Sequence, residues 1–311
     1  MMSDQFNRRE FFAKTAMSGI GAALTTAATV KAGEKQKTKQ KAKKKTKLST
    51  PSAEKIGWRL ACQLYTFRDR SFYEALEAIS SLGIRYVEPC FFLPLDKKRP
   101  DLRTSESLPP DVRRELKARL KDYGIRMINY YAPVDGNTAN FRKIFDFAKE
   151  MGARTLVAEP PAEVFEKLDE LCEEYKINLA IHNHPKSPQS KYWQPENVLK
   201  VCEGRSKRIG SCSDTGHWVR SGLDPIECLK KAKKRIITMH LKDVIESGNP
   251  QARDVPLGTG KANYTAVLKE LHAQKFRGVM TIEYEHLSAQ LVDDVAKCAN
   301  FVEDFAASLK K

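Results

Sequence analysis

Short apolar runs alternate with longer segments of helical periodicity along residues 56–311. Apolar runs of roughly four to eight residues indicate strands, and apolar residues at every third or fourth position indicate amphipathic helices. The predicted strands are Leu60–Phe67, Tyr86–Cys90, Met127–Ala132, Thr155–Glu159, Asn178–His182, Ile209–Ser213, Ile237–Leu241 and Val279–Tyr284. The predicted helices are Phe72–Leu82, Pro110–Tyr123, Thr138–Met151, Ala162–Tyr175, Pro195–Cys202, Asp224–Lys233, Tyr264–Gln274 and Leu287–Leu309.

The spacing of these elements predicts the fold. Successive strands begin roughly 23 to 42 residues apart, which is the length of one strand–helix unit. Three helices end in a glycine turn directly before the next strand, in Gly83-Ile84-Arg85, Gly124-Ile125-Arg126 and Gly152-Ala153-Arg154. Repeated units of this kind predict an α/β protein with a single (β/α)8 TIM barrel over residues 56–311. A doubly wound dinucleotide fold is disfavoured, because no Gly-x-Gly-x-x-Gly follows the first strand.

The first 32 residues have the pattern of a signal peptide. Arg8 and Arg9 precede Phe11 and Phe12, and an apolar run of small residues follows from Ala16 to Val30. That run is shorter than the roughly 20 residues of a membrane-spanning helix. The paired arginines resemble the twin-arginine export signal of bacteria. We therefore expect the twin-arginine translocase as a partner and a mature protein in the periplasm or cell envelope.

Residues 33–55 are predicted to form a disordered, lysine-rich linker, since their composition cannot bury apolar surface. Residues 1–47 carry +9 of the net charge of +15, so the predicted barrel is only mildly basic. Nucleic acid is therefore not the expected partner of the barrel. A tether to nucleic acid or to an anionic surface is the alternative role for the lysine-rich segment.

Histidines gather at one end of the predicted barrel. Five of the six histidines lie at or just after the carboxyl ends of strands, and only His272 lies on a helix. Active sites of TIM barrels are built at that end of the strands. The sequence thus predicts a site at the carboxyl ends that contains His182, His184, His217, His240 and His286.

Acidic residues end several of the same strands. Glu159, Asp214 and Glu283 close apolar runs, and the period of two places His240 with Lys242 on one strand face. A carboxylate buried in an apolar strand is costly unless it is paired or bound to a cation. We therefore expect a divalent metal, with Mn, Zn, Co and Mg all compatible with these ligands. A salt-bridged polar layer is the alternative.

Three motifs carry a resemblance to a known family. They are Asp214-Thr-Gly-His217, His240-Leu-Lys-Asp243 and the segment Val255-Pro-Leu-Gly-Thr-Gly260. Over residues 57–305 the chain resembles the xylose isomerase-like TIM-barrel superfamily. This sugar phosphate isomerase/epimerase group includes tagatose epimerases, inosose dehydratase and endonuclease IV.

The resemblance implies that Asp214, His240 and Glu283 hold a metal. The family's fourth ligand is a glutamate on the fifth strand, where this chain has His182. Either His182 or Glu159 is therefore expected to complete the metal site.

The resemblance also implies a divalent-metal-dependent isomerase or epimerase that acts on a sugar or keto-sugar. A base removes the proton next to the carbonyl, and a metal-stabilised enediolate forms. Glu283, Glu159 and His184 are the candidate bases. Lys242 is a candidate for polarising the carbonyl, and the candidates for substrate binding are His184, His217, Lys242, Tyr65, Glu88 and Trp218.

Other functions fit the same residues. A lyase or dehydratase acting on a keto-sugar or cyclitol would use the same site. A non-catalytic, exported carbohydrate-binding barrel is a further alternative. An endonuclease-IV-like phosphodiesterase is disfavoured, because its three-metal cluster needs more histidines than these strand ends supply. The sequence also leaves a homo-oligomer open.

Overall fold

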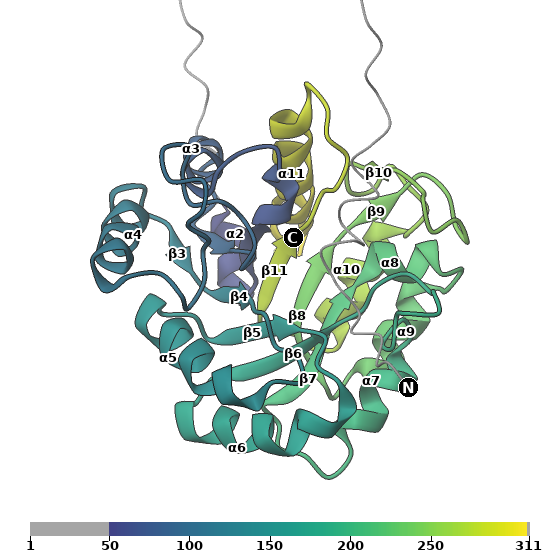
Figure 1. Ribbon diagram of the computed structural model, residues 1–311. Helices are drawn as coiled ribbons and strands as arrows, with labels where there is room; N and C mark the ends of the chain where they lie inside the picture. Colours follow the sequence, from purple (N-terminus) through teal and green to yellow (C-terminus); the bar gives the residue numbers. More distant parts are fainter. Residues whose placement is uncertain (1–49, 310–311) are drawn as a thin grey trace, which may run out of the picture. The chain divides into compact units, whose positions relative to one another are not determined.

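Parallel strands form the centre of residues 50–309, the part of the chain that the computed structural model describes (Figure 1). The strands are hydrogen-bonded in the order β3-β2-β1-β11-β8-β7-β6-β5-β4. Their bounds are β1 Arg59–Gln63, β2 Tyr86–Glu88, β3 Arg126–Met127, β4 Asn129–Tyr131, β5 Thr155–Ala158, β6 Asn178–His182, β7 Ile209–Asp214, β8 Ile236–Leu241 and β11 Val279–Ile282.

The two ends of this strand order meet at one split strand. β3 pairs with β2 and β4 pairs with β5, and only Ile128 separates β3 from β4 in the chain. A parallel bridge between Cys90 and Tyr131 joins the neighbourhood of β2 to β4 as well. The predicted (β/α)8 barrel is therefore confirmed, with its third strand in two pieces.

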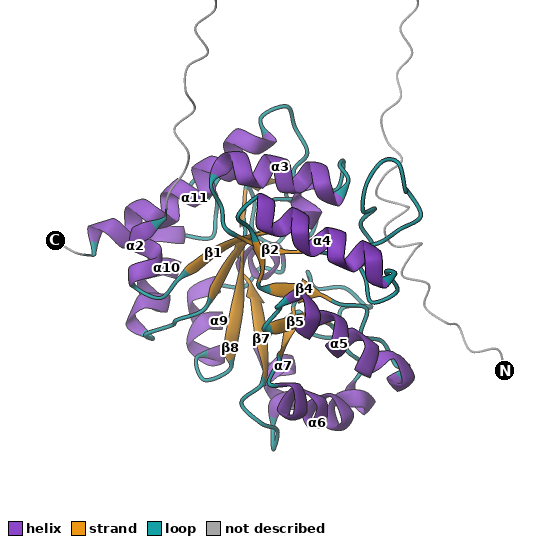
Figure 2. Cartoon of the chain, turned by 90° about the vertical axis from the view of Figure 1, so that its left-hand side faces the viewer, coloured by secondary structure: helices purple, strands orange, loops and turns teal. Residues whose placement is uncertain are grey.

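Helices surround the strands (Figure 2). Most follow the predicted positions, because amphipathic periodicity and end signals agree. Ser71 and Glu74 form a capping box at the start of α3, and Gly83 ends it with a φ of 78°. The helices are α2 Pro51–Lys55, α3 Phe72–Leu82, α4 Pro110–Asp122, α5 Phe141–Met151, α6 Phe165–Tyr175, α7 Pro195–Cys202, α8 Thr215–Arg220, α9 Pro225–Ala232, α10 Tyr264–Ala273 and α11 Leu291–Ser308.

The structure differs from the predicted elements in several places. The end of the first predicted strand, Leu64–Phe67, is a 3-10 helix. The first turns of the helices predicted from Thr138 and Ala162 are also 3-10 turns. Helix α8 and a short hairpin of β9 (Asp243–Val244) and β10 (Asp254–Val255) were not predicted, because segments this short carry little periodicity.

A short helix packs against the barrel just before residue 56, the predicted start of the barrel domain. Helix α2 has Ala53 buried, and the amides of Ser52 and Ala53 donate to the Glu303 carboxylate at 2.7 and 2.9 Å. Residues 51–55 of the predicted linker over 33–55 are helical, while its residues 33–49 and the predicted signal peptide over 1–32 lie outside the described residues. Within residues 50–309, no helix combines the length and apolar character needed to cross a bilayer.

The strand period of two explains how the barrel positions polar groups. Val157, Ala180 and Cys212 form a small apolar cluster, separate from the main core, on the face of the strands that points inward. Two residues further along the same faces stand Glu159, His182 and Asp214. A dry interior layer is thus followed directly by a polar layer at the carboxyl ends of the strands.

We predict that Trp58→Ala lowers the free energy of unfolding by about 3–5 kcal/mol. Trp58 is 1% exposed, stacks on Phe305 with ring centroids 5.9 Å apart, and donates to the Phe276 carbonyl at 3.0 Å. The half-buried Trp193 is the matched control, and Trp193→Ala should cost less than about 1 kcal/mol. Urea unfolding followed by circular dichroism measures both, and equal losses would contradict this account.

Candidate active site

Four buried side chains, from strands β6 and β7, helix α8 and the residue directly after β11, form the centre of the site. The ligand atoms of this group, which we call the central group, lie within 4.8 Å of one another, and its members are His182, Asp214, His217 and Glu283. His182 Nε2 lies 3.5 Å from Asp214 Oδ2 and 3.9 Å from Glu283 Oε2. These distances are too long for hydrogen bonds but suit two ligands of one ion.

The chemistry of the central group fits a divalent cation. Neither ring nitrogen of His182 makes a hydrogen bond to any described residue, although the side chain is 1% exposed. A buried polar group without such a partner is costly unless something else satisfies it. Mixed carboxylate and imidazole donors are typical ligands of zinc and related metals.

His240 lies beside the central group and is oriented by Glu88. Its Nε2 is 2.8 Å from Glu88 Oε1, while its Nδ1 is 3.1 Å from Glu283 Oε2 and 3.9 Å from Asp214 Oδ2. Both ring nitrogens therefore face carboxylate oxygens, and Glu88 would hold a ring proton on Nε2 when Nδ1 turns its lone pair to a cation in the central group. Glu88 was expected to line the substrate pocket. It is completely buried against His240, and Asn129 also donates to it at 3.0 Å.

Lys242 carries a buried positive charge into the same centre. Its Nζ lies 3.1 Å from Asp214 Oδ2 and 2.9 Å from both Glu283 Oε2 and Glu285 Oε1. Burial alone would lower the pKa of Lys242, but these carboxylates raise it well above its usual value. The path of this side chain requires glycine at position 216, where a Cβ would lie 2.4 Å from Lys242 Cγ.

Arg220 is a site residue that the sequence analysis missed. It is 6% exposed, and its guanidinium donates to Glu285 at 2.5 Å and to Asp254 at 2.6 Å. It also lies 3.2 Å from Nδ1 of His217, whose Nε2 is 3.1 Å from Lys242 Nζ. Burial, followed by the charges of Lys242 and Arg220, holds the pKa of His217 well below its usual value. His217 is therefore neutral between two cations.

A carboxylate–imidazole pair forms a second group, which we call the Glu159–His184 dyad. His184 Nδ1 lies 2.8 Å from Glu159 Oε1, and the Tyr131 hydroxyl donates to the same oxygen at 2.8 Å. Burial would raise the pKa of Glu159, but His184 and then His182 hold it well below its usual value. The His184 side chain is 30% exposed, so it is accessible from solvent.

The remaining predicted residues lie around this centre or outside it. Tyr65 is half-buried, with the Arg68 guanidinium 4.5 Å from its ring centroid. Trp218 is 1% exposed and packs in the core on α8. His286 belongs to neither group, so the predicted convergence of five histidines holds for four.

The glycine-containing motif after β10 has a structural role. The Asp243 carboxylate accepts hydrogen bonds from the backbone amides of Gly258, Gly260 and Ala262 at 2.9–3.0 Å. A Cβ at Gly260 would lie 2.3 Å from Asp243 Oδ1, so only glycine fits there. The motif thus fixes the loop that follows the His240 strand.

The fold and the site define a (β/α)8-barrel protein with a buried His/Asp/Glu centre at the carboxyl ends of its strands. Residues 76–302 match the family described as Xylose isomerase-like TIM barrel. The chain belongs to this family.

Curated relatives match part of the chain. The Rhizopine catabolism protein MocC of Rhizobium meliloti is 28% identical over 136 residues, covering 38% of this chain and 41% of that protein. An inosose dehydratase of Geobacillus thermodenitrificans is 25% identical over 195 residues, covering 49% of this chain and 64% of that protein. The chain therefore spans less than two thirds of the length of these relatives.

Solved structures match almost the whole barrel. An uncharacterized protein from Parabacteroides distasonis is 31% identical, with a TM-score of 0.65 over 80% of this chain and 99% of that one. The IolI protein, solved with a bound zinc atom, is 19% identical, with a TM-score of 0.63 over 80% of this chain and 98% of that one. At that identity the second likeness supports the fold alone.

We predict that Glu88→Gln lowers metal affinity by about 10- to 100-fold without removing a ligand. The glutamine amide group can donate a hydrogen bond to His240 Nε2, whereas the Glu88 carboxylate can only accept one. The ring proton of His240 is then no longer held on Nε2. Elemental analysis after dialysis against a metal buffer measures occupancy, and His272→Ala on the exposed face of α10 is the control. Asp214→Ala and His182→Ala should lose more metal than Glu88→Gln. A folded Asp214→Ala protein with one tightly bound metal per chain would rule out this centre.

Proposed function

We propose that this protein is a metal-assisted lyase that removes water from a keto-sugar or a cyclitol ketone. The observation that carries the proposal is the close placement of two unlike groups, the Glu159–His184 dyad and the buried Lys242 ammonium. The Glu159–His184 dyad is built to accept a proton, whereas Lys242 is held in its charged form. Ring centroids of His184 and His217 are 5.2 Å apart, and His217 Nε2 lies 3.1 Å from Lys242 Nζ, so His217 connects the two groups.

The dyad supplies the base. With Nδ1–H donated to Glu159, the Nε2 lone pair of His184 accepts the proton from the carbon next to the substrate carbonyl. Glu159 orients the ring and stabilises the imidazolium that results, as a carboxylate does beside a catalytic histidine. Tyr131 holds Glu159 in place for this task.

Lys242 supplies the acid. Its ammonium proton passes to the hydroxyl on the next carbon, the carbon–oxygen bond breaks, and water leaves. The electron pair of the broken C–H bond becomes the new carbon–carbon double bond, so the product is an unsaturated ketone. Glu283, Glu285 and Arg220 position the ammonium and the charges around it.

A metal would add electrostatic stabilisation. His182, Asp214 and Glu283, with His240 beside them, would hold a divalent cation, which polarises the substrate carbonyl and stabilises the negative charge that develops on its oxygen. The likeness to inosose dehydratases, whose name states a dehydration, supports the proposed loss of water.

An isomerase or epimerase is the second candidate. Glu283 favours it, because burial would raise the pKa of this carboxyl but Lys242 and His240 hold it well below its usual value. An ionised Glu283 can therefore accept a proton, as the second base that epimerisation requires. The solved D-tagatose 3-epimerase-like protein, 17% identical, shares only the fold with this chain.

We predict that the metal-loaded protein converts an inosose or a 3-keto-sugar to an unsaturated ketone. His184→Ala and Glu159→Gln should each lower turnover by about 10²- to 10⁴-fold, because proton abstraction loses its base. The rate is followed by ultraviolet absorbance of the product and by deuterium incorporation from heavy water. His272→Ala is the control.

The two candidates give different products. Deuterium exchange with an inverted or moved hydroxyl, and without loss of water, would identify an epimerase or isomerase. No exchange and no product with intact metal would point to a carbohydrate-binding barrel and would refute both enzymatic proposals.

We also propose export by the twin-arginine route, based on Arg8 and Arg9 before the apolar run to Val30. Changing both arginines to lysine should retain the precursor in the cytoplasm, since that route distinguishes the guanidinium pair from two ammonium groups. Cell fractionation and the size of the mature chain provide the measurement. Unchanged location of the double variant would refute the proposal.

A further inference from the structure

Arginines begin several strands at the end of the barrel opposite the active site. The turns Gly83-Ile84-Arg85, Gly124-Ile125-Arg126 and Gly152-Ala153-Arg154 each deliver an arginine to the amino end of a strand. Arg59 begins β1 in the same way. The proposed reaction, at the carboxyl ends, uses none of these charges.

Three of these arginines line one cavity. Arg59, Arg126 and Arg154 border a cavity with a volume of about 300 Å³, together with Tyr86 and Ile128. Tyr86 and Ile128 belong to the apolar cluster, completed by Ala61 and Val279, that fills the amino end of the barrel interior. The cavity, which we call the arginine cavity, is therefore closed on its inner side by apolar residues.

The arginine cavity has an unbalanced positive charge. No residue among its described lining is acidic. Like charges placed together repel one another, and a bound anion relieves that repulsion. Arg126 is also pre-positioned, since it donates to the Tyr86 hydroxyl at 2.7 Å and its guanidinium lies 4.9 Å from the Tyr86 ring centroid. An anion would therefore find one of its donors already oriented.

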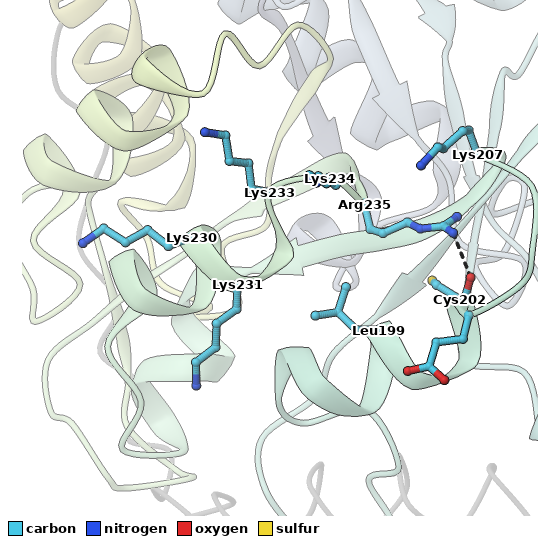
Figure 3. A pocket seen from close by; sticks show the side chains of 9 residues that line it. Leu199, Cys202, Lys207, Lys230, Lys231, Lys233, Lys234 and Arg235 are labelled. Carbon is cyan, nitrogen blue, oxygen red and sulfur yellow. Dashed lines mark hydrogen bonds between the residues drawn. The ribbon is translucent and has the colours of Figure 1, made fainter.

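A second basic surface does not have the unbalanced positive charge of the arginine cavity. A cavity with a volume of about 410 Å³ is bordered by lysines from residues 230–234 and by Arg235 (Figure 3). Lys230 and Lys231 pair with Glu227 and Glu196 at 2.8 and 2.6 Å. Figure 3 shows Arg235 turned towards the Cys202 carbonyl, to which it donates at 2.8 Å, and lysine side chains that point apart. These charges are compensated or dispersed.

We propose that the arginine cavity is a binding site for a phosphate group, carried by inorganic phosphate or by a small phosphate monoester. A guanidinium presents a planar fork of donors that binds two oxygens of a tetrahedral oxyanion at once. Arg59, Arg126 and Arg154 come from different strand–helix units, so their forks approach one anion from different sides. The site lies apart from the proposed catalytic centre and does not depend on the reaction assigned to it.

Isothermal titration of the metal-loaded protein with inorganic phosphate, at constant ionic strength in chloride, tests the proposal. We expect saturable binding of one phosphate per chain. Arg126→Gln and Arg154→Gln should each weaken it by about tenfold or more, and the double variant should abolish it. A parallel titration with glycerol phosphate distinguishes the sources, since tighter binding indicates a monoester and equal binding indicates inorganic phosphate.

Two controls keep the result specific. Arg85→Gln removes an exposed arginine from the same type of turn without touching the cavity lining, and Lys233→Gln/Lys234→Gln removes two charges from the surface in Figure 3. Both should bind phosphate like the unaltered protein, and circular dichroism checks that every variant folds. Absence of saturable binding, retention by the double arginine variant, or an equal loss in the controls would each overturn the site.

Discussion

The need to balance buried negative charge governs the active-site end of this barrel. Asp214, Glu283 and Glu88 are each buried, and Glu285, Asp254 and Glu159 are close to them. Against them stand the fixed cations Lys242 and Arg220. Carboxylates removed from water at this density are stable only if cations or protonated histidines accompany them. A divalent ion held by His182, Asp214 and Glu283, as proposed, would add positive charge to this balance as well as serving the chemistry.

The same charge balance connects Lys242 with the carboxylates of the proposed metal site. Lys242 reaches Asp214 and Glu283 from one side, so a cation bound by those carboxylates would share them with the ammonium. Two positive charges on shared carboxylates repel each other. Binding of a metal would therefore press Lys242 towards Glu285, which Arg220 already holds. The contacts of Lys242 with Glu285, and of Glu285 with Arg220, would therefore set the position of Lys242, the proposed acid, relative to the substrate carbonyl.

Much of this arrangement follows from the sequence, because the strand period of two is rigid. Once Asn178–His182 is a strand with Ala180 facing inward, His182 must face inward at its end, and the structure places it there. The site position of Arg220 and the contact of Glu88 with His240 could not be predicted from the sequence in this way. Arg220 lies on a six-residue helix with no clear periodicity, and Glu88 meets His240 across 152 positions of chain. Such contacts depend on barrel closure, which local patterns do not encode.

His182 is the point where this chain departs from the glutamate that the family resemblance leads one to expect. An imidazole in place of a carboxylate removes one negative charge from the centre and adds a nitrogen donor. Nitrogen donors favour zinc, cobalt and related ions over magnesium and calcium, which prefer oxygen ligands. The substitution also removes a carboxylate that could have served as a base on that side. The Glu159–His184 dyad lies directly beside His182, since the ring centroids of His182 and His184 are 4.7 Å apart. The proposed base His184 thus follows His182 at the end of the same strand, and its carboxylate partner Glu159 comes from the end of the neighbouring strand β5.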